Sequence, residues 1–356
     1  MIPVLNLSGS AYEQGWQHGQ QVRSLVPQLR AAMKVRLSVL HLQGVDLMPL
    51  LVEIDEVWSR YAPGTLSVLH GIADALELEW EEYFSYTVGS YLVDRIKHSS
   101  PSEGCTTWAA AGAVTRDGDP ILAKNRDFRP VHQALQCLAR ARPEQGHPYL
   151  YLTSAGSPGV YSSGINADGL VVADTHVASL DTGPGIARYS LMLDLLERFS
   201  TTGQAVNYIR TVPHFGDGTV TVLDAQGDMA VFELAHSIQT VRRPSEGFLV
   251  STNHFSEAQT RTRWVDESPS WMLGNSRARR SRVEVALHAA RGQVDLAWSQ
   301  ALMASHGDPL SSICRHSEID PHTVTIASAI YLPRQAAMYL SNGYPCQNPF
   351  KLYSVL

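Results

Sequence analysis

Apolar residues in the first hundred positions recur with the spacing of helices. Ser10 and Glu13 form a capping box, because the serine hydroxyl can accept from the Glu13 backbone N–H while the Glu13 carboxylate reaches back. The positions that follow predict one apolar helical face, made by Trp16, Val22, Leu25, Val26, Leu29, Met33, Leu37 and Leu40. Further helices are predicted over 63–78 and 80–93, the first with Leu66, Leu69, Ile72 and Leu76 facing inward.

The pattern changes at residue 104. Turn-forming residues fill 99–104, and strands are predicted over 106–114 and 120–128, joined by a turn at Asp117-Gly118. Short strands are further predicted over 135–142, 149–155, 160–165, 170–177, 219–223, 229–234, 238–242, 247–252, 323–331 and 336–341, and helices over 188–199, 203–211, 275–290 and 294–304. A helical start followed by hairpins and more helices predicts an α+β fold, with antiparallel sheets sandwiched by helices.

Composition narrows the class of protein. The 356 residues, 44% of them hydrophobic, suffice for a large core. A formal net charge of −6 gives little support to a nucleic-acid partner. No apolar run is long enough to span a membrane, and the amino terminus lacks the cationic region of a secretory signal. We therefore expect a cytoplasmic protein with neither nucleic acid nor membrane as partner, and a homo-oligomer stays open.

Several common catalytic signatures are missing from the sequence. There is no G-x-S-x-G elbow, no H-E-x-x-H, no phosphate-binding P-loop and no dinucleotide fingerprint. The four cysteines form no C-x-x-C pair, which argues against zinc and against a disulfide framework. His316 and His322 are the nearest approach to a ligand pair, and no third ligand accompanies them. We therefore predict no metal site and no cofactor.

The peptide bond between Gly104 and Cys105 stands at the boundary between the two patterns. A free cysteine is usually a small buried hydrophobe, which is our interpretation of Cys137, Cys314 and Cys346. Gly104 has no Cβ, so its carbonyl can be left open to attack by the thiol. Hydrolysis of the resulting thioester frees an α-amino group with a pKa of roughly 7.7–8.0, which can serve as the base for the neighbouring thiol.

Four motifs in order resemble the penicillin acyltransferase family of amino-terminal-nucleophile (Ntn) hydrolases. They are Gly104-Cys105-Thr106-Thr107-Trp108, Asn125-x-Asp127-Phe128, Ser251-Thr252-Asn253-His254 and Ser312-Ile313-Cys314-Arg315-His316. Residues 9–19 and 341–346 also fit, so the resemblance covers nearly the whole chain. It implies a four-layer αββα sandwich, with a helical propeptide or α-subunit segment over 1–104 packed on an Ntn domain over 105–356. It also implies cleavage between Gly104 and Cys105, after which the two fragments stay associated.

The resemblance also implies roles for five residues. Cys105 would be both the self-cleaving thiol and the nucleophile toward substrate, and Thr107 would assist processing. Asp127 would orient the new amino group. Asn253 would stabilise the oxyanion, and Arg315 would fix Asp127 or a substrate carboxylate. Each of four residues also has an ordinary structural interpretation. Thr107 could be a strand threonine, and Asp127 could cap local N–H groups. Asn253 could be a turn residue, and Arg315 a surface charge.

The predicted function is hydrolysis of a small N-acyl or β-alanyl-type amide through an acyl-enzyme on Cys105. Acyl transfer from a coenzyme A thioester or an amide to an amine uses the same residues and is the close alternative. The carboxyl-terminal Ser354-Val355-Leu356 differs from the Ser-Lys-Leu address, which disfavours a peroxisomal transferase. A binding protein that retains the fold and a papain-like Cys/His hydrolase that is never cleaved are the other candidates.

Overall fold

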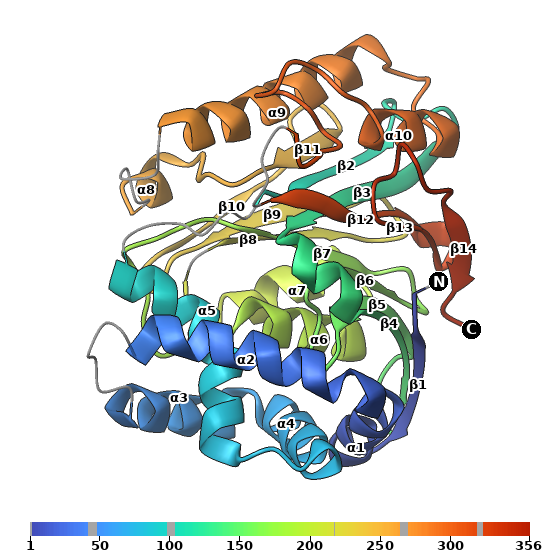
Figure 1. The fold of residues 1–356 in the computed structure, drawn as a ribbon. Coiled ribbons are helices and arrows are strands. Elements are labelled where there is room, and N and C mark those ends of the chain that lie inside the picture. Colours follow the sequence, from blue (N-terminus) through green and yellow to red (C-terminus); the bar gives the residue numbers. More distant parts are fainter. Residues whose placement is uncertain (1, 42–47, 98–103, 217, 264–269, 319–322) are drawn as a thin grey trace.

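The protein is a four-layer sandwich in which two β-sheets pack face to face between two layers of helices (Figure 1). The computed structural model describes residues 2–41, 48–97, 104–216, 218–263, 270–318 and 323–356. The first sheet has the strand order β1 (Val4–Gly9), β4 (Gln136–Pro143), β5 (Tyr149–Ser154), β6 (Ser163–Asn166), β7 (Val171–His176), β8 (Gly218–Leu223), β9 (Met229–Leu234) and β10 (Gln239–Arg242). The second has the order β11 (Phe248–Ser251), β2 (Thr106–Gly112), β3 (Gly118–Phe128), β12 (Val324–Leu332), β13 (Ala337–Asn342) and β14 (Lys351–Ser354). This architecture confirms the predicted αββα class.

Strand β2 shows how alternation divides the core. Ala109 and Ala111 belong to the apolar cluster between the two sheets. Trp108 and Ala110 belong instead to the cluster under α9 (Ser270–Ala289) and α10 (Leu296–Met303). Because side chains along a strand alternate between its faces, Cys105 at the start of this strand shares the face of Ala109 and is directed between the sheets.

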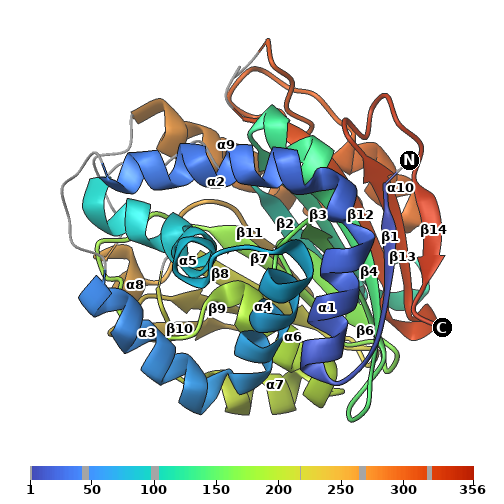
Figure 2. The same ribbon diagram turned by 60° about the horizontal axis from the view of Figure 1, so that its bottom comes forward.

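The helices of the amino-terminal segment cover the outer face of the first sheet (Figure 2). They are α1 (Ala11–Gln21), α2 (Val26–His41), α3 (Met48–Tyr61), α4 (Pro63–Leu76) and α5 (Trp80–Lys97), which share this side with α6 (Arg188–Arg198) and α7 (Thr202–Ile209). The short α8 (Ala258–Arg261) lies on the other side, near α9. The capping box at Ser10 and the inward face of α4 are confirmed.

The prediction of one continuous apolar helical face from Trp16 to Leu40 is wrong, because the helix is interrupted between α1 and α2. Trp16, expected on the buried face, is 40% exposed. Glycines make the α1–α4 contact instead: a Cβ on Gly15 would lie 2.2 Å from the Val68 carbonyl oxygen. A Cβ on Gly71 would lie 2.2 Å from the Tyr12 carbonyl oxygen, so the two backbones approach too closely for a large side chain.

The amino-terminal segment also supplies a strand that the sequence analysis did not predict. Strand β1 pairs in parallel with β4 at one edge of the first sheet, with Leu5 and Leu7 buried. Buried polar contacts join the helices to the rest of the chain: the Trp58 indole N–H donates to the Gly185 carbonyl at 2.8 Å, and the Tyr83 hydroxyl donates to the Gly156 carbonyl at 2.8 Å. None of the helices in the described ranges has the length and apolarity to cross a membrane.

We predict that Gly71→Ala destabilises the protein, because the added methyl group meets the backbone of α1. The expected loss is about 1–3 kcal/mol, the usual cost of overpacking a close contact. Gly64→Ala is the matched control in the same helix, since nothing lies within 4 Å of its added Cβ. Urea denaturation measures both free energies of unfolding, and equal values for the two variants would contradict the glycine contact.

Candidate active site

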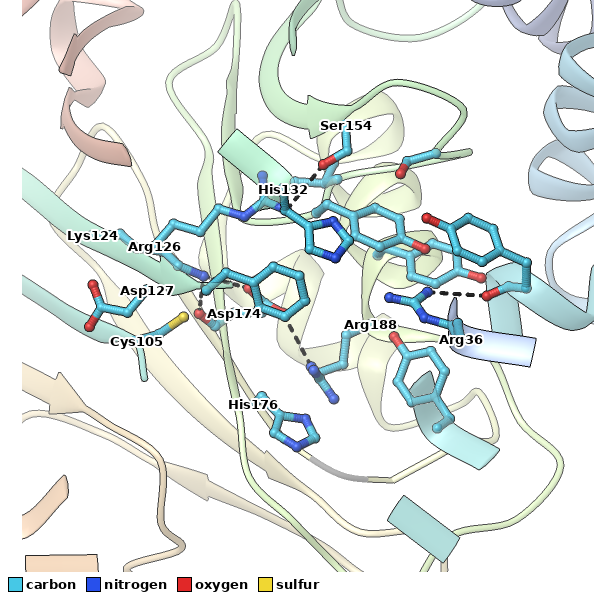
Figure 3. Close-up of a pocket in the computed structure, with 17 residues that line it drawn as sticks. Arg36, Cys105, Lys124, Arg126, Asp127, His132, Ser154, Asp174, His176 and Arg188 are labelled. Atoms are coloured by element: carbon cyan, nitrogen blue, oxygen red, sulfur yellow. Dashed lines mark hydrogen bonds and ion pairs between the residues drawn. The ribbon is translucent and has the colours of Figure 1, made fainter. Parts of the chain in front are cut away.

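Cys105 lies at the wall of a pocket, with its sulfur directed into the pocket (Figure 3). The residue is 7% exposed, and its backbone is held on both sides. The Cys105 N–H donates to Asn253 Oδ1 at 2.9 Å, and its carbonyl oxygen accepts from Arg279 at 2.7 Å. The β2–β3 ladder continues through the preceding residue, because the Gly104 N–H donates to the Asp127 carbonyl at 3.3 Å.

Gly104 has a steric reason to be glycine, in addition to the conformational freedom that the sequence suggested. A Cβ at this position would lie 1.8 Å from Arg315 Nη1 and 3.5 Å from Asp127 Oδ2. The Arg315 guanidinium and the Asp127 carboxylate therefore lie directly against the residue whose carbonyl would be attacked. Any larger residue would displace one of the two predicted site residues.

Asp127 is buried, and its two carboxylate oxygens differ. Oδ1 accepts from the Thr325 hydroxyl at 2.7 Å, and that hydroxyl oxygen in turn accepts from the Arg315 backbone N–H at 2.8 Å. Oδ2 has no hydrogen-bond partner within the described ranges. Burial raises the pKa of the Asp127 carboxyl above its usual value, although Arg315 and Arg279 oppose this. A buried oxygen without a donor is costly, so Asp127 Oδ2 can accept a hydrogen bond from a further donor.

The side chain of Asn253 holds the nitrogen of Cys105. Its Oδ1 accepts both from the Cys105 N–H and from Arg279 at 2.8 Å. Since both partners are only donors, the amide oxygen must be on this side. Its Nδ2 donates one hydrogen to the His176 carbonyl at 2.9 Å, which leaves the second for another acceptor. The oxyanion role of Asn253 therefore stays a prediction, and positioning of the Cys105 nitrogen is an observation.

Arg279 is a site residue that the sequence analysis did not identify. Its guanidinium is fully buried in oxygen acceptors, which are Cys105 O, Thr106 Oγ1, Asn253 Oδ1 and Asn275 Oδ1. Burial and the nearby Arg315 lower the pKa of Arg279 to about 10, so it stays charged near neutral pH. A signal was present in the sequence, because Arg279 falls on the same helical row as the buried Val283 and Leu287.

The buried Lys124 and the half-buried Asp174 form an ion pair that the sequence analysis did not identify. Lys124 Nζ lies 2.5 Å from Asp174 Oδ1 and donates to the Ser162 carbonyl at 3.1 Å. Burial raises the pKa of the Cys105 thiol, while the charge of Lys124 lowers it, and the balance leaves the pKa raised. The Cys105 thiol is therefore protonated near neutral pH.

Thr107 and the histidines next to the motifs are the remaining residues that the sequence analysis considered. The Thr107 hydroxyl is buried, shares the strand face of Cys105 and has no hydrogen-bond partner in the part of the chain that the structure describes. His254 contacts Ser276 at 2.7 Å, and burial lowers the pKa of His254 to about 3. No described histidine nitrogen is hydrogen-bonded to the Cys105 sulfur. His322 lies outside the described residues.

The amino-terminal segment forms one wall of the pocket. Arg36 of α2 and Tyr86 and Tyr91 of α5 line it, and Arg36 lies across the pocket from Cys105 (Figure 3). The Arg36 guanidinium lies 4.6 Å above the Tyr86 ring and donates to the Tyr86 carbonyl at 3.1 Å. Burial, Arg36, Arg126 and Arg129 lower the pKa of His132, another lining residue, to about 3. The potential in this part of the pocket is therefore positive.

Comparisons with solved structures gave low similarity. A conjugated bile acid hydrolase variant from Clostridium perfringens matches with a TM-score of 0.47 and 14% identity, over 70% of this chain and 96% of that one. An N-acylethanolamine-hydrolyzing acid amidase ortholog from Caenorhabditis elegans matches with 0.47 and 18%, over 65% and 93%. Penicillin V acylase from Agrobacterium tumefaciens matches with 0.44 and 14%, over 67% and 83%.

Comparison with curated proteins gave a relative from Archaeoglobus fulgidus, described as an uncharacterized protein, that is 20% identical over 235 residues. The match covers 58% of this chain but 38% of that protein, so the chain spans well under half of its length. The model of the acyl-coenzyme A:6-aminopenicillanic acid acyl-transferase family matches residues 114–347. This segment holds Asp127, Asn253, Arg279 and Arg315 and begins just after Cys105. Because it spans about two thirds of the chain, the protein belongs to the acyl-coenzyme A:6-aminopenicillanic acid acyl-transferase family.

Proposed function

We propose that the chain cleaves itself between Gly104 and Cys105 and then hydrolyses an N-acyl amide through an acyl-enzyme on Cys105. One observation carries this proposal: residues from distant segments fix both peptide groups around a buried thiol. Asn253 binds the Cys105 N–H, Arg279 binds its carbonyl, and Asp127 presents a carboxylate oxygen beside Gly104. A cysteine that served only to fill the core would not need three polar side chains around its backbone.

In the proposed cleavage, the Cys105 sulfur attacks the Gly104 carbonyl carbon, and its proton passes to the Asp127 carboxylate. The C–N bond breaks as the Cys105 nitrogen takes up that proton, which leaves a thioester. Water then hydrolyses the thioester to the Gly104 carboxylate and the free Cys105 thiol. The raised pKa of Asp127 supports this role, because a carboxylate with a higher pKa is a better base.

In the proposed turnover, the freed α-amino group takes the thiol proton as Cys105 attacks the substrate carbonyl. Asp127 Oδ2 accepts a hydrogen bond from that amino group, which fills its missing contact. The second Asn253 Nδ2 hydrogen stabilises the oxyanion, and the amine leaves with a proton. Water resolves the acyl-enzyme. Acyl transfer to an amine is the second candidate, because the matching family is named for that reaction. Transfer and hydrolysis differ only in whether an amine or water resolves the acyl-enzyme.

The pocket supports an aromatic acyl group with a neutral or anionic substituent. Tyr86, Tyr91, Tyr161 and Tyr189 line it together with Arg36. A positive potential disfavours a cationic β-alanyl group, so of the two predicted substrate types we propose the N-acyl amide. Because Arg36 belongs to the segment before the cut, that segment would take part in substrate binding and would remain bound after cleavage.

We predict that intact mass finds two fragments, the second beginning at Cys105. Cys105→Ala should leave one 39.1 kDa chain without turnover, since both steps need the thiol. Cys137→Ala is the control, because Cys137 is a buried cysteine outside the pocket and should not affect cleavage. A wild-type chain that remains at 39.1 kDa would rule out self-processing. A whole precursor with activity that depends on a histidine would instead support the papain-like alternative.

We predict that Asp127→Asn slows cleavage by roughly a hundredfold or more, the usual loss for a general base. In the wild type the carboxylate acts only when ionised, so the rate should rise with pH through a midpoint above 3.8, because the pKa of Asp127 is raised. The variant should lose this acid limb. Asp117→Asn is the control, since Asp117 is exposed in the β2–β3 turn. An unchanged acid limb in Asp127→Asn would show that another group is the base.

We predict that Arg36→Gln raises KM for acyl amides that carry a carboxylate and leaves KM for neutral aromatic acyl amides nearly unchanged. The expected rise is about tenfold, a typical loss for an ion pair in a partly enclosed site. Steady-state kinetics on paired neutral and anionic substrates measures both values. Equal KM changes for the two substrates would mean that Arg36 only supports the wall of the pocket.

A further inference from the structure

Four side chains outside the pocket converge in a way that the sequence analysis did not foresee. His306, Cys314 and His316 lie in the segment between α10 and β12, and Cys346 follows β13. The possible ligand atoms of all four lie within 4.8 Å of one another. The Cys314 and Cys346 sulfurs are 3.7 Å apart, and His316 Nε2 lies 3.6 Å from the first and 3.1 Å from the second.

These distances match the edges of a tetrahedral zinc site. With Zn–S of about 2.3 Å and Zn–N of about 2.0 Å, neighbouring donors in a tetrahedron are roughly 3.3–3.8 Å apart. Three of the donors already lie 3.1, 3.6 and 3.7 Å apart, close to such spacing, and His306 completes the set after an approach of about 1 Å. We propose that His306, Cys314, His316 and Cys346 bind a structural zinc ion as a Cys₂His₂ site. Two thiolates with two imidazoles are a ligand set that selects zinc over magnesium or calcium.

The surroundings of His316 suit a metal ligand. The His316 ring stacks on Tyr344 with centroids 4.0 Å apart, which fixes the plane of the imidazole. Its Nδ1 lies 3.9 Å from a Glu318 carboxylate oxygen, on the side away from the two sulfurs. A carboxylate beside the second ring nitrogen is a common outer partner of zinc-bound histidine.

The backbone holds this segment in place before any ion binds. The Ser305 carbonyl accepts from the N–H groups of Ile313 and Cys314 at 3.2 and 3.0 Å, which closes the loop that carries two of the ligands. Burial raises the pKa of the Cys314 thiol. A bound cation would lower the pKa of this thiol, because it stabilises the thiolate.

The zinc site would help to hold Arg315 in place in the active site, because Arg315 lies between the ligands Cys314 and His316 in the sequence. Its backbone N–H and carbonyl both pair with Thr325, at 2.8 and 2.9 Å. The zinc site itself does not depend on the proposed function, since its ligands are neither Cys105 nor Asp127. A disulfide between Cys314 and Cys346 is the competing arrangement, and it requires the sulfurs to approach to about 2.05 Å.

The test is metal analysis of the full-length protein under reducing conditions. Protein stripped with a chelator and then dialysed with zinc sulfate should retain about one zinc per chain by mass spectrometry of the metal. Cys346→Ser and His306→Ala should each weaken zinc binding at least about tenfold. His288→Ala is the matched control, because His288 is an exposed histidine on α9, outside this cluster. Cobalt(II) in place of zinc should give the absorption of tetrahedral thiolate coordination, and Cys346→Ser should reduce it.

Both substituted residues are exposed, so unfolding is not expected, and circular dichroism checks that the variants are folded. Three results would overturn the proposal. They are a reduced protein that binds no zinc, zinc that is bound equally well by Cys346→Ser and His306→Ala, and a Cys314–Cys346 disulfide in a protein that takes up no zinc once reduced. The metal content and the cobalt spectrum are independent of catalysis, so failure of the site and failure of the proposed function are distinguishable.

Discussion

The hydrogen bonds of the Arg279 guanidinium are the interaction on which the geometry around Cys105 depends. A buried charge is costly unless its donors are satisfied, and within the described residues the hydrogen-bond acceptors around Arg279 are neutral oxygens. Arg279 therefore fixes the carbonyl of Cys105 and the amide oxygen of Asn253 together. Because that same amide oxygen accepts from the Cys105 N–H, the orientation of Asn253 and the position of the nitrogen follow from one buried cation.

The sequence predicted most elements from their periodicity, and the failures have physical causes. The β2–β3 hairpin was predicted because two strand-like stretches flank an Asp-Gly turn. Strand β1 was not, because six residues interrupted by the polar Asn6 and Ser8 are too few to define a period, and its pairing with β4 joins positions far apart in the chain. The break after α1 escaped notice because the apolar spacing continues through it, at Val22, Leu25 and Val26.

The candidate site was predicted only in part. Motif order singled out Cys105, Asp127, Asn253 and Arg315, and the structure brings all four together. Arg279, Lys124 and Asp174 were missed because their importance depends on burial, which a single sequence does not reveal for a charged residue. The Cys/His cluster was missed because its ligands come from segments 30 residues apart rather than from a compact C-x-x-C spacing.

Thr325 connects Asp127 to the segment that carries Cys314, Arg315 and His316. Its hydroxyl oxygen accepts from the Arg315 N–H, so its single hydrogen is free to donate to Asp127 Oδ1. That bond leaves Asp127 Oδ2 on the side of Gly104, where it lacks a donor within the described residues. The segment that carries Cys314 and His316 therefore sets the orientation of the Asp127 carboxylate through two hydrogen bonds. A shift of this segment would move the Arg315 N–H and turn Asp127, even though none of its cysteines or histidines contacts the nucleophile.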